Sequence, residues 1–293
     1  MDVVTVERLT KNYGRRVGVE GLNLRVAEGT MFGFLGPNGS GKTTTIRIFM
    51  GFLRPSSGAA RVFGLDCWRD SARIKADVGY LPGDLRLYPW LTCREAMRTF
   101  ARVRGRDLTR AGAELAEEFG LDPEVRVRAM SRGMRQKLGL VIALAHAPRL
   151  LILDEPTASL DPLMQEKLYR RLREAVAAGG TVLLSSHTLS EVEDLCSQVA
   201  ILRSGRLVAH ESLEGLRSRA RRRVTLRWRS VEDALRGGTS PDGVDWIERG
   251  TLQWRGVVRG PVTGLLRWIA DQPIEDVVLE PPDLTETFRG FYR

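Results

Sequence analysis

The segment Gly36–Thr43 constrains the fold of this chain more than any other feature of the sequence. Its residues, Gly-Pro-Asn-Gly-Ser-Gly-Lys-Thr, match the phosphate-binding pattern GxxxxGK[ST] at every defined position. The apolar run Met31–Leu35 before it predicts a buried strand, and we expect a helix to begin near Lys42. Glycines let successive backbone N–H groups face one phosphate, and the positive end of the helix adds to the attraction. The sequence therefore predicts an α/β fold with a nucleotide-phosphate site.

The side chains of this loop have separate expected roles. Lys42 supplies a mobile cation to the β and γ phosphates, and the Thr43 hydroxyl can ligate Mg²⁺. The residues expected to bind the nucleotide here are Gly36, Asn38, Gly39, Ser40, Gly41, Lys42, Thr43 and Thr44.

A second acidic element lies further along the chain. The apolar run Leu150–Leu153 is followed by Asp154 and Glu155, which predicts a buried strand that carries two carboxylates at its carboxyl end. Ligands bind at that end in open α/β sheets. We expect Asp154 to hold Mg²⁺, through water, and Glu155 to orient or deprotonate the attacking water.

With these motifs in order, residues 2–216 resemble the ATPase subunits of ABC transporters. Met130–Gln136 is similar to the signature segment LSGGQ, and Leu160-Asp161 is similar to the D-loop. His187, after the predicted strand Thr181–Ser185, resembles the switch histidine, and Tyr13 resembles the aromatic residue that stacks on adenine. The resemblance implies a P-loop nucleotide-binding domain with an antiparallel β subdomain and a helical subdomain. It also implies ATP hydrolysis with Mg²⁺, with Lys42, Glu155 and His187 as the catalytic residues.

The resemblance further implies that the site is completed by a second polypeptide. This chain carries one copy of each motif, so the simplest partner is a second copy of itself, with ATP between the two. Ser131 and the Gly133 amide of one subunit would contact the γ-phosphate held by Lys42 of the other, and Asp161 would lie at the same interface.

Two positions depart from the family pattern. Gly83 stands where the Q-loop usually has glutamine, so Asp84 becomes a candidate Mg²⁺ ligand. Arg132 replaces the first glycine of the signature and Met134 its glutamine, while Ser131 and Gly133 remain. We expect hydrolysis to survive these changes.

Other segments are similar to type 2 ABC exporters of the drug-resistance branch. They include Leu87–Glu95, Asp161–Gln165 and the tail Glu280–Phe288. In such exporters the permease is a separate polypeptide, so residues 83–100 would contact its cytoplasmic helices. Trp90 and Leu91 would then be exposed in the isolated subunit. The resemblance implies export of a drug-like or lipophilic compound.

The chain is expected to contain two domains. Residues 1–216 alternate strands with helices and form the ATP-binding domain, and residues 217–223 form an arginine-rich linker. Residues 224–293 show the order strand-helix-strand-strand-helix-strand, which predicts a small α+β ferredoxin-like domain.

The sequence lacks the features that would predict a membrane-spanning or secreted protein. The chain has no run of 18 apolar residues, and its start, MDVVTVERLT, does not resemble a secretory signal. We therefore expect a cytoplasmic protein, peripheral on the cytoplasmic face of the cell membrane and attached only through the permease. The net charge of +9 comes from basic residues interleaved with acidic ones, so no specific nucleic-acid partner is predicted. The three cysteines, Cys67, Cys93 and Cys196, lack CxxC spacing and are expected to be reduced.

One alternative function stays open at this point. A soluble regulatory or non-transport ABC-type ATPase would carry the same motifs. A P-loop kinase or GTPase is disfavoured by the signature segment, by His187 and by the lack of an Asn-Lys-x-Asp guanine motif.

Overall fold

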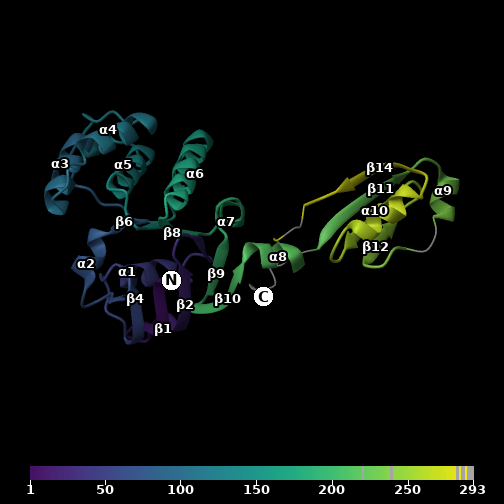
Figure 1. Cartoon of the computed structure of the whole chain (residues 1–293), viewed down its shortest axis with the longest axis horizontal. Coiled ribbons are helices and arrows are strands. Elements are labelled where there is room, and N and C mark those ends of the chain that lie inside the picture. Colours follow the sequence, from purple (N-terminus) through teal and green to yellow (C-terminus); the bar gives the residue numbers. More distant parts are fainter. Residues whose placement is uncertain (220, 238–239, 282–283, 285–287, 289–293) are drawn as a thin grey trace. The chain divides into compact units, whose positions relative to one another are not determined.

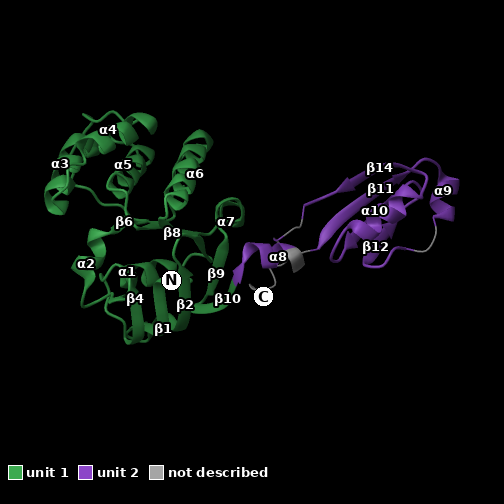
Figure 2. Ribbon diagram, in the orientation of Figure 1, with its two compact units in different colours: residues 1–210 green, residues 211–293 purple. Residues whose placement is uncertain are grey.

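A computed structural model describes residues 1–219, 221–237, 240–281, 284 and 288 of the chain. These residues divide into two units, 1–210 and 211–293 (Figure 2). The division falls before the predicted boundary at 216–223. The predicted linker is not an irregular segment, because it holds the end of helix α8 (Leu213–Arg219) and the start of strand β11 (Arg222–Trp228). Most of the Glu280–Phe288 tail lies outside the described residues.

The first unit is organised by a six-stranded sheet. Along the sheet its strands are β10 (Arg206–Ser212), β9 (Gln198–Arg203), β3 (Met31–Leu35), β8 (Thr181–Ser186), β7 (Leu150–Asp154) and β6 (Val78–Leu81). The pairs from β9 to β6 are parallel. Every residue of β3, β7 and β8 is buried, as expected for parallel strands covered on both faces. The carboxyl ends of these three neighbouring strands therefore meet at one edge.

A smaller antiparallel sheet lies on one side of the six-stranded sheet (Figure 1). Its spatial order is β2 (Arg16–Ala27), β1 (Asp2–Tyr13), β4 (Ser57–Val62) and β5 (Leu65–Asp66). Apolar residues of this sheet, of α1 (Lys42–Phe49) and of the six-stranded sheet share one hydrophobic core. This arrangement agrees with the predicted antiparallel β subdomain.

A helical layer that contains α3 (Cys93–Arg104), α4 (Thr109–Glu118) and α5 (Arg132–Leu144) lies on the side of the six-stranded sheet away from the antiparallel sheet (Figure 1). The remaining elements are α2 (Ser71–Ala76), whose Ile74 belongs to the shared hydrophobic core, a 3₁₀ turn (Val127–Ala129), α6 (Pro162–Ala177) and α7 (Leu189–Leu195). Helices α3, α4 and α5 pack against one another (Figure 1). Thr92 begins α3 with a capping box in which Glu95 accepts the Thr92 N–H. Among the described helices, none has the length and apolar character needed to cross a bilayer.

One exposure prediction made for this layer is wrong. Trp90 is exposed, at 59%, and stacks on Tyr88 at 5.6 Å between ring centroids. Leu91, however, is only 6% exposed. The backbone explains this difference, because the Leu91 N–H bonds to Tyr88 and its carbonyl accepts the Val127 N–H. These bonds direct the Leu91 side chain inward, just before α3 begins. The three cysteines are buried and unpaired, as predicted.

The second unit carries its own sheet and core. After α8 and β11 come α9 (Val231–Arg236), β12 (Val244–Arg249), β13 (Gln253–Val258), α10 (Thr263–Ala270) and β14 (Ile274–Leu279). The spatial order is β12-β13-β11-β14, and all neighbours are antiparallel. Each helix thus connects two parallel strands that have a third strand between them, which is the ferredoxin-like arrangement expected from the sequence. Trp228 and Trp254 pack edge to face in its core.

Candidate functional site

The phosphate loop joins the carboxyl end of β3 to the first residue of α1. Gly41, immediately before the helix, has φ of 109°, a conformation that a side chain would strain. At Gly36 a Cβ would lie 2.5 Å from the Leu202 carbonyl oxygen, so only glycine fits there. The Lys42 side chain is buried under the loop, and its Nζ donates to the carbonyls of Gly36 and Pro37. The loop thus holds Lys42 and the open helix end at one position.

An unpartnered hydroxyl marks the same loop as a ligand site. Ser40 is 2% exposed, and its Oγ has no hydrogen-bond partner among the described residues. A buried hydroxyl without a partner is costly. A phosphate oxygen in the loop would supply the missing partner.

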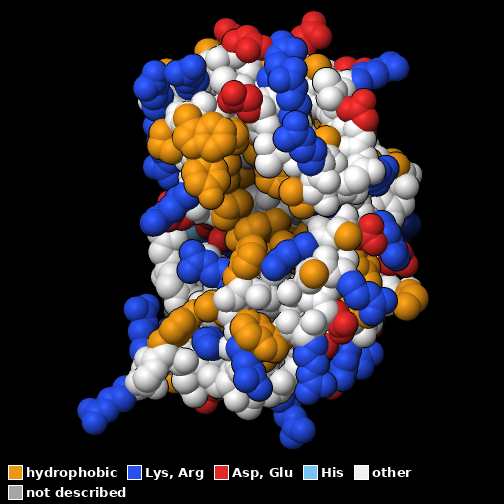
Figure 3. Space-filling model, turned by 90° about the vertical axis from the view of Figure 1, so that its left-hand side faces the viewer, with side chains coloured by type: hydrophobic (Ala, Val, Ile, Leu, Met, Phe, Trp, Pro, Cys, Tyr) orange, Lys and Arg blue, Asp and Glu red, His pale blue; other side chains and the backbone are white. Residues whose placement is uncertain are grey.

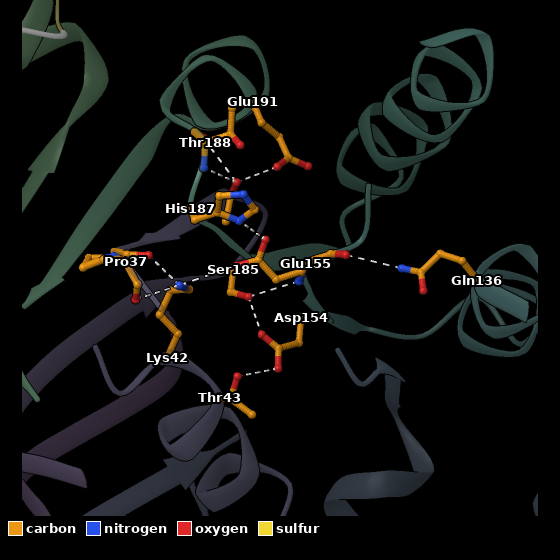
Figure 4. Close-up of polar contacts among 12 residues, drawn as sticks. Pro37, Lys42, Thr43, Gln136, Asp154, Glu155, Ser185, His187, Thr188 and Glu191 are labelled. Carbon is orange, nitrogen blue, oxygen red and sulfur yellow. Dashed lines mark hydrogen bonds and ion pairs between the residues drawn. The ribbon is translucent and has the colours of Figure 1, made fainter. Parts of the chain in front are cut away.

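Asp154 and Thr43 meet at the carboxyl end of β7 (Figure 4). The Thr43 hydroxyl donates to Asp154 Oδ2 at 2.8 Å, and the Ser185 hydroxyl donates to Oδ1. Asp154 is 1% exposed, so its carboxylate is held rigidly. A hydroxyl and a carboxylate oxygen at one point are a donor set that suits Mg²⁺, which keeps several waters and takes further ligands from phosphates. No group of three or more His, Cys, Asp or Glu side chains forms a metal cage in the part of the chain that the structure describes.

Glu155 and His187 form a close pair beside Lys42. His187 Nδ1 lies 2.6 Å from Glu155 Oε2, and Lys42 Nζ lies 3.5 Å from Glu155 Oε1 (Figure 4). Glu155 has a left-handed backbone, with φ of 53°, which costs a non-glycine residue about 1–3 kcal/mol. Its N–H donates to the carbonyl and the hydroxyl of Ser185, which hold it in this conformation. The pair can accept and relay a proton near the end of the phosphate loop.

A cavity of about 680 Å³ connects these groups. Its walls include the predicted residues Tyr13, Asn38, Gly39, Ser40, Gly41, Lys42, Thr43, Thr44, Asp84, Asp154, Glu155 and His187. At the far end the Tyr13 hydroxyl lies 3.5 Å from Thr44 Oγ1. The Tyr13 ring lies over Gly18, where a Cβ would be 2.7 Å from a ring carbon. Tyr13 is 45% exposed, so its ring can offer a flat apolar surface to a base.

Four predicted residues do not line this cavity: Gly36, which lies at the start of the phosphate loop, and three residues near the starts of α5 and α6. Ser131 caps α5 by accepting the Met134 N–H at 3.2 Å, and Asp161 caps α6 by accepting the Met164 N–H at 2.9 Å. Gly133 packs where a Cβ would lie 2.8 Å from the Ser159 carbonyl oxygen. These last three residues occupy the start of α5 and α6 instead of the cavity wall.

The two departures from the family pattern also have structural consequences. A Cβ at Gly83 would lie 3.2 Å from Asp154 Oδ2, so this glycine lets the backbone approach the carboxylate closely. Asp84 reaches the cavity wall but pairs with Arg86 at 2.9 Å. Arg132 is exposed and lines the cavity, where it adds a positive charge.

Sequence reasoning gave no role to two residues that support the site. Gln136 is buried, and its Nε2 donates to the carbonyls of Pro156 at 3.0 Å and Glu155 at 3.3 Å (Figure 4). Ser185 connects Asp154 with the Glu155 N–H. A polar residue on the otherwise apolar face of α5, and a serine that ends a buried strand, were the available signals.

Comparisons with known proteins show which family this chain is similar to. The family model described as "ABC transporter" matches residues 19–158. The chain is 38% identical to the bacitracin transport ATP-binding protein BcrA of Bacillus licheniformis, covering 75% of this chain and 73% of that protein. It is 34% identical to the daunorubicin resistance ATP-binding protein DrrA3 of Streptomyces coeruleorubidus, covering 97% and 94%. A solved structure of an ATP-binding subunit of an ABC transporter is 32% identical, with a TM-score of 0.69, and covers 73% of this chain and 92% of its own.

Proposed function

This chain belongs to the family of ATP-binding subunits of ABC transporters, and we propose that it works as a dimer on a separate membrane permease. It binds and hydrolyses ATP to energise export. The observation that carries this conclusion is the convergence of Lys42, Thr43, Asp154, Glu155 and His187 at one edge of the parallel sheet.

We expect ATP to lie in the cavity with its base at Tyr13 and its phosphates in the phosphate loop. The Tyr13 ring would stack on adenine, and the loop N–H groups and Lys42 would hold the phosphates. Such stacking is worth about 1–3 kcal/mol per base. Thr43 and Asp154 would hold Mg²⁺, which would neutralise phosphate charge during the reaction.

Hydrolysis would depend on Glu155 and His187. Glu155 would orient the attacking water and accept its proton, while His187 would keep the carboxylate in position and contact the γ-phosphate. Lys42 already lies close to Glu155, so the cation and the base act at the same place. The chemistry requires little beyond positioning and neutralised charge.

The second copy would complete the site through the starts of α5 and α6. Ser131, Gly133 and Asp161 do not line their own cavity, which supports a role toward the nucleotide of a partner. The capped N-terminus of α5, a helix of 13 residues, would present its positive end to the γ-phosphate. In this arrangement ATP holds two subunits together until it is hydrolysed.

An apolar surface beside α3 supports docking of the permease. Tyr88 and Trp90 are 69% and 59% exposed and stack on each other. Figure 3 shows hydrophobic side chains gathered beside a hollow on the face that carries α2 and α3. Leu85, Leu87 and Phe100 line this hollow. Cytoplasmic helices of a permease would cover this surface and so place the chain on the cytoplasmic face of the membrane.

The cargo is proposed from the relatives. BcrA and DrrA3 are named for bacitracin transport and daunorubicin resistance. A drug-like or lipophilic compound is therefore the proposed substrate class. The match to DrrA3 extends through the C-terminal unit, which suits this branch of the family.

Rates of ATP hydrolysis test the catalytic part of the proposal. Glu155→Gln should lower kcat by about 10²–10⁴-fold while ATP binding is kept, because only the proton acceptor is lost. With excess ATP and Mg²⁺ this variant should accumulate as a dimer in size-exclusion chromatography. Bound ATP with only background hydrolysis in the wild type would instead indicate a regulatory nucleotide binder.

Co-purification tests the docking surface. A Tyr88→Ser, Trp90→Ser double variant should lose its membrane partner and keep its basal ATPase rate, because both side chains lie away from the nucleotide cavity. Leu235→Ser, at a position on α9 that is 83% exposed and does not line this hollow, is the matched control for polarity. Retained co-purification of the double variant would contradict the proposed surface.

A further inference from the structure

His187 depends on its backbone for its orientation. Its side chain is 58% exposed, so packing does not fix the ring. Its ring is hydrogen-bonded to Glu155 through Nδ1. A histidine that must face a phosphate and a carboxylate together therefore needs a rigid segment on each side of it.

A buried carboxyl supplies that rigidity from α7. Glu191 is 5% exposed, and its Oε2 accepts the Ser186 hydroxyl at 2.6 Å. The same hydroxyl accepts the Thr188 N–H at 2.9 Å. Ser186 and Thr188 are the two neighbours of His187 in sequence. The Glu191 carboxyl binds Ser186 directly and Thr188 through the Ser186 hydroxyl (Figure 4). The Ser186 carbonyl also accepts the N–H of Gly36, at the start of the phosphate loop.

This contact is more than an ordinary helix cap. Glu191 is the third residue of α7, where a capping-box glutamate would accept the N–H of the N-cap residue Thr188. Here the Ser186 hydroxyl takes that N–H, and the carboxyl binds Ser186 instead. The Glu191 carboxyl therefore binds the segment before His187 and does not cap the helix.

The electrostatic surroundings connect Glu191 with the reacting groups. Burial raises the pKa of this carboxyl, and the charge of Glu155 raises it further. Hydrogen bonding by Ser186 and Thr157 and the nearby His187 act in the opposite direction. The carboxyl is therefore close enough to respond to both members of the Glu155–His187 pair.

We propose that Glu191 is a positioning residue for ATP hydrolysis, which acts through Ser186 to hold His187 against Glu155. This inference rests on the proposed roles of Glu155 and His187. Glu191 itself does not line the nucleotide cavity and touches no reacting atom.

The test is a kinetic cycle on the full chain. Glu191→Ala should lower kcat about tenfold with the KM for ATP unchanged, because binding groups are untouched. Glu191→Gln should recover most of the rate, since its amide oxygen can still accept the Ser186 hydroxyl. Asp194→Ala, an exposed position on the same helix, is the matched control and should behave as the wild type.

The cycle with His187 separates positioning from general stability. In a His187→Ala background, Glu191→Ala should cause no further loss of kcat, because the group it positions is gone. An equal loss in both backgrounds, or full kcat in Glu191→Ala, would overturn the inference. If Glu191→Ala does not fold, Ser186→Ala removes the same link and should show the same pattern.

Two further outcomes distinguish this inference from the proposed function. Full hydrolysis by both Glu155→Gln and His187→Ala would overturn the proposed roles, and the positioning role of Glu191 with them. Loss of hydrolysis in those variants together with full kcat in Glu191→Ala would overturn only the role of Glu191.

Discussion

Replacing Gln136 by leucine tests whether its hydrogen bonds to the loop Glu155–Pro156 support the proposed catalytic base. Leucine is similar in volume, so packing on α5 is largely kept. The change removes two hydrogen bonds, to the carbonyls of Pro156 and Glu155. A buried carbonyl that loses its partner costs about 1–3 kcal/mol. Since Glu155 also has a left-handed backbone, this bond helps to hold a strained conformation.

The expected magnitude follows from these contacts. A loss of about 2 kcal/mol lowers the Tm of a domain of roughly 200 residues by about 4–8 °C. The kcat for ATP should fall about tenfold, because a misplaced base loses transition-state stabilisation, while the KM stays near the wild-type value. Calorimetry measures the Tm of the unfolding transition, and a steady-state phosphate-release assay measures kcat and KM.

Lys137→Leu is the matched control. It lies beside Gln136 on α5, outside Met130–Gln136, and does not line the nucleotide cavity. It should keep both the Tm and the kcat of the wild type. If Gln136→Leu also keeps both, the two hydrogen bonds do not support the loop and the reasoning is refuted.

Three further changes probe the site and its frame. Tyr13→Ala should weaken ATP binding by about 1–3 kcal/mol in a fluorescent-nucleotide titration, with Tyr13→Phe near wild type, because stacking needs only the ring. Gly41→Ala should abolish ATP binding, since φ is 109° and the new Cβ would lie 2.8 Å from the Gly18 carbonyl oxygen; an affinity like that of wild type would contradict this. Burial alone would raise the pKa of Glu118, but hydrogen bonds from Arg171 and Arg170 hold this pKa below the ordinary 4.5. This stabilisation is present above pH 4.5 and lost as pH falls through the lowered pKa. The stability advantage of wild type over Glu118→Gln in urea titrations should therefore shrink below that pH.

The groups that we propose to react each belong to a short local pattern, so the sequence alone could single them out. The loop around Lys42 and the acids Asp154 and Glu155 follow apolar strands directly. Parallel strands bring their carboxyl ends to one edge, so the groups that follow β3 and β7, with β8 between them, lie together.

The supporting residues could not be predicted in the same way. Gln136 and Glu191 look like ordinary polar positions on helices, and their partners lie on other elements. The exposure prediction for Leu91 was wrong for a similar reason. The inward direction of that side chain depends on backbone bonds to Tyr88 and Val127, and the second of these lies far along the chain.

The amino-acid order by itself determined that this chain binds a nucleotide phosphate, because glycine spacing and a following helix are local properties of Gly36–Thr43. It also determined the order of elements in the C-terminal unit, since alternation and turns are local as well. Only the tertiary structure decided how the carboxylate of Glu155, the proposed base, is held. The left-handed backbone of Glu155 persists because Ser185 and Gln136, distant in sequence, bond to it at once. A strained backbone can be held by several bonds in this way only when separate elements pack together.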